Sequence, residues 1–208
     1  PAGEFLMQRS AVAEFWQRNY RWAVHTGALA PLAWTLWLVF SGGLTVNPIQ
    51  DLTLRTGRTA LVLLLFSLAC SPANRWLKWK WALKARRTLG LYAFFYALLH
   101  VLIFTVLDYG LDLRLILAAA VEKRFVLVGM GAFTILLLLA ITSFDYWKVR
   151  LRKNWKRLHR LVYLAGGLVI VHYAWAVKSD VRVPLAYGAV LLLLLALRLP
   201  ISARAIKR

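Results

Sequence analysis

Four histidines are the residues of this chain best suited to chemistry. His25, His100, His159 and His172 each lie within or at the edge of an apolar stretch. An ionisable side chain inside a bilayer is costly and usually has a functional reason to be there. Neutral imidazole binds iron well, and paired axial imidazoles can hold a b-type haem between two helices. His159 and His172 lie on one predicted helix, separated by a rise of about 20 Å. This spacing suits two stacked metal centres that carry electrons across a membrane.

The elements that position these histidines are predicted to be membrane helices. Apolar residues make up 61% of the chain, well above the roughly 45–50% of a soluble domain. Apolar runs predict an all-helical bundle of six spans, at residues 22–40, 57–71, 89–107, 125–144, 158–177 and 183–199. We interpret residues 1–6 as a cloning scar, with Met7 as a native start, and residues 7–208 as one domain. We find no convincing internal repeat.

The distribution of charge predicts the orientation of these spans. The formal net charge is +19, but the basic residues cluster between apolar runs, which indicates membrane topology and no nucleic-acid partner. The N-terminal tail, the connections 72–88 and 145–160, and the C-terminal tail hold 20 of the 27 Lys and Arg residues. Because cytoplasmic segments carry the excess of positive charge, both termini are predicted to be cytoplasmic. The single Cys70 excludes a disulfide framework and a thiolate cluster.

This topology groups the histidines into two level pairs. His25 and His159 lie at the predicted cytoplasmic end, and His100 and His172 lie nearer the outer face. A headgroup or capping role is the alternative for His25, and His159 could equally be one more surface cation. No carboxylate lies within the core of a predicted span. A proton-coupled transporter usually needs one there, so this absence favours electron transfer. Gly166 and Gly167 could kink the fifth helix or admit a flat macrocycle.

Four stretches of the sequence resemble the MsrQ family. They are TGRTAL at 56–61, RRTLGLYAFFYALLH at 86–100, WKRLHRLVYL at 155–164 and VHYAWAVK at 171–178. The family comprises haem-binding membrane subunits of bacterial periplasmic methionine sulfoxide reductase systems, formerly grouped with ferric reductase-like transmembrane proteins. The likeness extends over nearly the whole chain, with several motifs in the same order.

The resemblance implies a multi-pass protein of the bacterial inner membrane that relays electrons outward through haem b. The donor would be the quinone pool or a cytosolic flavin reductase, with FMN as a further cofactor. The acceptor would be a periplasmic molybdopterin reductase subunit that repairs methionine sulfoxide in oxidised proteins. By position, His100, His159 and His172 match the family's haem-ligand histidines, and His25 matches a further family histidine.

The number of haems stays open at this point. Ferric reductase-like proteins carry two histidines on each of two helices, whereas Arg86 and Arg87 stand here where the inner partner of His100 would be. The inner haem therefore either recruits His25 or is absent. Arg86 and Arg87 are candidates for a propionate or an FMN phosphate, and Arg58 for a propionate.

The chain is expected to be an electron-transfer subunit and no stand-alone catalyst. It contains no G-x-G-x-x-G turn for a nucleotide, so it would relay electrons between partners. The basic segment 75–87, RWLKWKWALKARR, suits a helix lying in the lipid headgroups. Two other functions remain alternatives: a ferric or other metal-ion reductase using the same haems, and a haem-free small transporter with structural histidines.

Overall fold

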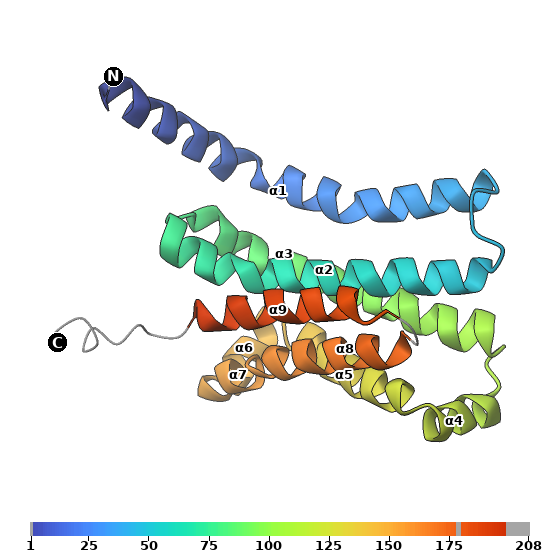
Figure 1. Cartoon of the computed structure of the whole chain (residues 1–208). Coiled ribbons are helices and arrows are strands. Elements are labelled where there is room, and N and C mark those ends of the chain that lie inside the picture. Colours follow the sequence, from blue (N-terminus) through green and yellow to red (C-terminus); the bar gives the residue numbers. More distant parts are fainter. Residues whose placement is uncertain (1, 178–179, 199–208) are drawn as a thin grey trace.

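The computed structural model describes residues 2–177 and 180–198, with side chains from Arg18 onward. Within this part of the chain every regular element is helical. The elements are α1 (Ala2–Phe40), α2 (Pro48–Leu77), α3 (Lys80–Leu102), the π-helix η1 (Ile103–Asp108), α4 (Leu113–Glu122), α5 (Arg124–Ile141), α6 (Asp145–Leu151), α7 (Lys153–Leu158), α8 (Leu161–Ala176) and α9 (Arg182–Ala196). The long helices lie side by side as a bundle (Figure 1).

Four helices are long and apolar enough to cross a membrane: Arg18–Phe40, Pro48–Leu77, Lys80–Asp108 and Arg124–Ile141. α8 and α9 are apolar but have only 16 and 15 residues. At about 1.5 Å per residue each is shorter than the roughly 30 Å hydrocarbon core. The predicted all-helical class is therefore confirmed for the described residues, four helices have the length and composition of membrane spans, and the count of six spans stays a prediction. Position 199, the predicted end of the sixth span, lies outside the described residues.

The second helix is longer than the apolar run at 57–71 indicated. It starts at Pro48, whose fixed φ suits the first helical turn, and Asn47 caps it by accepting a hydrogen bond from the Gln50 backbone N–H at 3.1 Å. Arg55 Nε lies 2.7 Å from the Asp51 carboxylate one turn earlier. Polar residues thus extend the helix beyond its apolar part, because capping and i,i+4 pairing stabilise that turn.

Two helical hairpins form the centre of the bundle. α2 packs along α3, and α5 packs along α8. The core between them includes Leu64, Ala93, Tyr96, Leu136 and Ala165. α1 lies against α3, where the Tyr96 hydroxyl donates to the Ala28 carbonyl at 2.7 Å, and α9 packs against α2 and α8.

The basic connections gather at one end of the bundle. The α2–α3 turn, α6, α7 and the end of α9 lie there, and α4 lies at the other end (Figure 1). The predicted surface helix at 75–87 is absent. α2 ends at Leu77, Lys78 adopts a left-handed conformation (φ 59°), and α3 begins at Lys80. The amphipathic composition of this segment therefore belongs to the facing ends of two long helices.

Candidate haem site and an electropositive inner cavity

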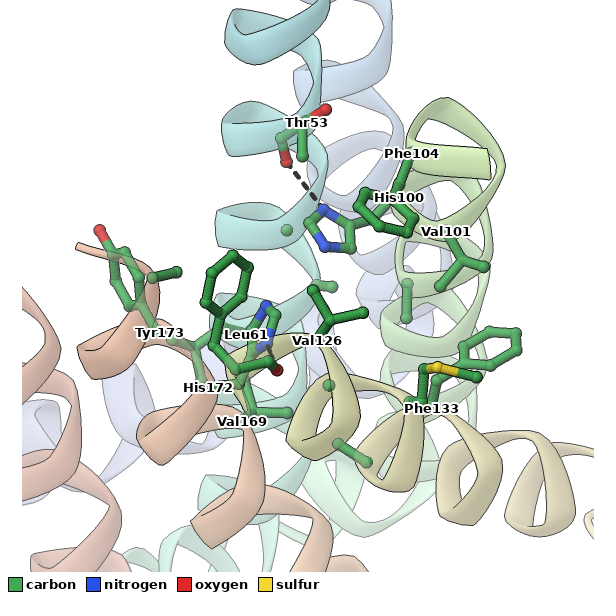
Figure 2. A pocket seen from close by; sticks show the side chains of 18 of the residues that line it. Thr53, Leu61, His100, Val101, Phe104, Val126, Phe133, Val169, His172 and Tyr173 are labelled. Atoms are coloured by element: carbon green, nitrogen blue, oxygen red, sulfur yellow. Dashed lines mark hydrogen bonds between the residues drawn. The ribbon is translucent and has the colours of Figure 1, made fainter. Parts of the chain in front are cut away.

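His100 of α3 and His172 of α8 meet inside the bundle. Their ring centroids are 6.1 Å apart, and the ring planes are nearly perpendicular at 89°. Both rings project into the same cavity of about 380 Å³ (Figure 2). The structure therefore brings together the two histidines that the sequence assigned to the outer pair.

Each of these imidazoles is held by a backbone carbonyl. His100 Nδ1 lies 2.9 Å from the Thr53 oxygen, and His172 Nδ1 lies 2.7 Å from the Phe125 oxygen. A carbonyl oxygen can only accept, so Nδ1–H is the donor in both hydrogen bonds. In the neutral imidazole this leaves the lone pair on Nε2. Metal-bound histidines are usually oriented by this kind of hydrogen bond from the other ring nitrogen.

The separation of the rings fits two axial ligands on one metal ion. A metal–nitrogen bond of about 2 Å, with the nitrogen roughly 1.1 Å from the ring centre, places opposite imidazole centroids about 6 Å apart. No group of three His, Cys, Asp or Glu side chains gathers for a metal within the described residues. The two histidines would therefore supply the axial positions, and the remaining ligands would come from a macrocycle.

The walls of this cavity suit an apolar macrocycle with an acidic edge. Its lining is dominated by Leu, Val, Ala and Phe side chains from α2, α3, α5 and α8. Among the lining residues Arg58 is the only Lys or Arg, and its Nη2 lies 3.4 Å from the Tyr173 hydroxyl. The residues present thus fit a haem: two nitrogen ligands, apolar walls and one guanidinium for a propionate.

His159 lies at a second cavity, of about 490 Å³, toward the basic end of the bundle. Its ring stacks on Trp155 with centroids 4.0 Å apart, and its Nε2 lies 3.2 Å from the Thr142 hydroxyl. That hydroxyl already donates to the Leu138 carbonyl at 2.7 Å, so it accepts from Nε2–H. In the neutral ring the lone pair is then on Nδ1.

His159 does not lie on one continuous helix with His172, as the sequence suggested. α7 ends at Leu158 and α8 begins at Leu161, so His159 is the residue that caps α7. The rise of about 20 Å expected along a single helix therefore does not apply.

This second cavity, called the inner cavity below because it lies at the end predicted to be cytoplasmic, is electropositive. Besides His159, its lining contains five basic side chains and no Asp or Glu; the five are Arg86, Arg87, Lys148, Lys156 and Arg160. Close by, the carboxylate of Asp145 accepts a hydrogen bond from Lys148 Nζ at 2.7 Å. This bond, with the positive charges of Lys148 and Arg87, lowers the pKa of Asp145. Such a cavity favours an anionic ligand.

His25 lies elsewhere, on α1 where this helix faces α3, and its side chain is exposed. Its Nδ1 is 2.8 Å from the Tyr92 hydroxyl, and the two rings meet edge to face. His25 does not line the cavity of His159, so the structure does not bring this predicted inner pair into contact. A shared haem for His25 and His159 stays a prediction.

The chain matches the family model described as "ferric reductase like transmembrane component" over residues 56–170. The bundle and its paired histidines thus define a member of the ferric reductase-like transmembrane proteins. No solved structure matches the chain.

More specific relatives are bacterial proteins described as the protein-methionine-sulfoxide reductase heme-binding subunit MsrQ. The chain is 40% identical to the one from Xanthomonas euvesicatoria, with 87% of each chain covered. It is 42% identical to the one from Caulobacter vibrioides, over 83% of this chain and 82% of the relative. For Deinococcus radiodurans the identity is 43%, over 89% and 93%. The chain therefore belongs to the MsrQ family, a multi-pass membrane family of haem-binding, electron-transfer subunits.

Proposed function

We propose that this protein relays electrons across a bacterial inner membrane through haem b bound between His100 and His172. The observation that carries this proposal is the pair of facing imidazoles, each hydrogen-bonded through Nδ1 to a carbonyl. Haem, when bound, supplies reversible one-electron redox chemistry. His100 and His172 would hold it through Nε2, the apolar walls would exclude water, and Arg58 would pair with a propionate.

The position of the second cavity supports a relay with two stations, by which we mean two sites that each hold a redox cofactor. Leu64 and Leu136 line both cavities, so the cavities meet at this pair inside the bundle. His159 and the five cationic side chains would hold an anionic redox group at the inner station, either a second haem or FMN. Electrons would enter from the quinone pool or a flavin reductase.

The proposed direction of transfer is outward, to a periplasmic molybdopterin reductase that repairs methionine sulfoxide. The relatives carry the name of a methionine sulfoxide reductase subunit, which supports this acceptor. Most basic residues lie at the end of the inner cavity, which supports a cytoplasmic location for that end and for both termini. In this arrangement α8 and α9 complete six spans, with flanking residues reaching the interface.

The haem proposal is tested by a reduced-minus-oxidised absorption spectrum of the purified protein. Wild type should show a b-type signal, and His100→Ala and His172→Ala should each lose the outer haem because one axial ligand is removed. His25→Ala, which changes a histidine outside both cavities, should retain it. Folded wild type without a haem signal would contradict the proposal and favour a haem-free transporter.

The inner station is tested with Arg86→Gln. Arg86 is half-buried and its guanidinium donates to the Ser71 hydroxyl at 3.2 Å. Replacing it should weaken the binding of the anionic group, whether FMN or haem, by about tenfold. The reason is that a hydrogen bond to a charged group contributes about 1.5–3 kcal/mol. FMN titration by fluorescence and haem assay would measure this.

Lys84→Gln is the matched control, since Lys84 is exposed on α3 and lies outside the cavity lining. Unchanged FMN affinity and haem content in Arg86→Gln would contradict the proposal that this cavity binds an anionic redox group.

A further inference from the structure

Each of the two facing imidazoles lies against a glycine of the neighbouring helix. A Cβ atom built on Gly57 of α2 would come within 2.9 Å of His100 Nδ1. One built on Gly129 of α5 would come within 2.6 Å of His172 Nδ1. Real Cβ atoms essentially never make contacts this short, so a side chain at either position would displace the ring.

The two hairpins repeat this arrangement. Gly57 lies one helical turn after Thr53, and Gly129 lies one turn after Phe125, the two residues whose carbonyls accept the Nδ1–H bonds. In both hairpins 47 residues separate the carbonyl from its histidine. A carbonyl oxygen has two lone pairs, so it can accept from the ring in addition to the helix backbone. The absence of a Cβ at the next turn gives the ring room to reach that oxygen.

We propose that Gly57 and Gly129 are positioning residues for the haem ligands, one for each face of the macrocycle. This inference rests on the proposed haem function. The hydrogen bond leaves the lone pair on Nε2 and raises the basicity of the imidazole, which would favour the ferric state of a bound haem and lower its reduction potential. The two glycines also set the planes of the rings, which lie at 89° to each other.

The test uses Gly57→Ala and Gly129→Ala in the full-length purified protein. An imidazole bound to iron cannot turn away from the new methyl group, so the Nδ1–H bond should lengthen and the ring should tilt. We expect the midpoint potential to rise and the haem to be retained less well. The EPR spectrum of the oxidised protein should lose the strongly anisotropic low-spin signal expected for perpendicular axial imidazoles. Gly129→Ala should show the larger change, since its contact is the shorter.

Gly131→Ala and Gly167→Ala are matched controls. They carry the same gain in helix propensity, but the nearest atom to a Cβ at Gly131 is Leu168 Cδ1 at 3.9 Å, and nothing lies within 4 Å at Gly167. Both controls should keep the wild-type potential and EPR signal. Thermal unfolding of haem-free protein provides a second measurement, and Gly57→Ala and Gly129→Ala should unfold like the two control variants because an unligated imidazole can rotate away.

Two results would overturn the inference and leave the haem proposal standing. One is a wild-type potential and EPR signal in Gly57→Ala and Gly129→Ala. The other is a loss of haem-free stability in these variants that accounts for their loss of haem, which would mean a helix-packing role. If wild-type protein itself shows no haem with two axial imidazoles, it is the proposed function that fails.

Discussion

At the residue scale, the two haem-ligand candidates differ from the other histidines in how their rings are held. His100 and His172 each donate from Nδ1 to a carbonyl, whereas Nδ1 of His25 faces a tyrosine hydroxyl and His159 is bonded through Nε2. A backbone carbonyl fixes the tautomer of the ring, because it offers no proton of its own. This difference explains why we assign the outer pair to a haem and leave His25 outside it.

The residue scale also yields a prediction for Arg58. Arg58→Gln should lower the midpoint potential of the outer haem, because the loss of a nearby positive charge makes adding an electron less favourable. Redox titration of purified protein measures the shift. Arg55→Gln is the control on the same helix: Arg55 pairs with Asp51 and does not line the cavity. An equal potential in the two variants would show that Arg58 does not act on the haem.

The sequence predicted that His100 and His172 lie close together, but not which groups contact their rings. His100 and His172 stand out because ionisable residues at depth in apolar helices are rare. Thr53, Phe125, Gly57 and Gly129 give no such signal, since each contacts a histidine of another helix and the contact depends on the register of the hairpin. Gly166 and Gly167, which the sequence suggested as a kink or an approach for a macrocycle, have no imidazole atom within 4 Å of an added Cβ. A Cβ on Gly166 would face Leu191 of α9.

At the element scale, apolar periodicity located the helices better than it located their ends. α2 extends through polar residues because of its cap and its ion pair, and the segment at 75–87 became the ends of α2 and α3. α6 and α7 are separate because Arg152, which lies between them, adopts a positive φ of 47°, and a second break follows between Leu158 and Leu161, where α7 ends and α8 begins. Such breaks arise from tertiary packing, which the apolar pattern does not report.

The attachment of α1 gives a prediction at this scale. Few residues of α1 are buried, and the Tyr96 hydroxyl, itself buried, donates to the Ala28 carbonyl across the α1–α3 contact. Tyr96→Phe should lower the free energy of unfolding by about 1 kcal/mol, because one buried hydrogen bond is lost. Unfolding in mixed micelles measures the change.

Tyr187→Phe serves as the comparison for this variant. Its hydroxyl has no hydrogen-bond partner among the described residues, so its removal should leave the stability of the protein unchanged. An equal effect of both substitutions would argue against the Tyr96–Ala28 bond as a tie between α1 and α3.

At the scale of the whole molecule, the bundle contains two cavities: an apolar one that holds His100 and His172, and an electropositive one that holds His159 and lies nearer the basic end. They meet at Leu64 and Leu136, which belong to the first helices of the two hairpins. The sequence predicted two levels of histidines. It did not predict that the inner level would combine one histidine with five cations, since these come from α3, α6, α7 and the α7–α8 connection. A relay through both cavities accounts for this arrangement.

The most direct test of the relay is electron transfer across a vesicle membrane. Proteoliposomes would enclose a membrane-impermeant reductant, with an impermeant ferric acceptor outside, and acceptor reduction would be followed by absorbance. If the relay is correct, wild-type protein will reduce the acceptor far faster than empty vesicles, and His100→Ala and His172→Ala will fall to the empty-vesicle rate. Wild-type vesicles no faster than empty ones, or unaffected histidine variants, would contradict it.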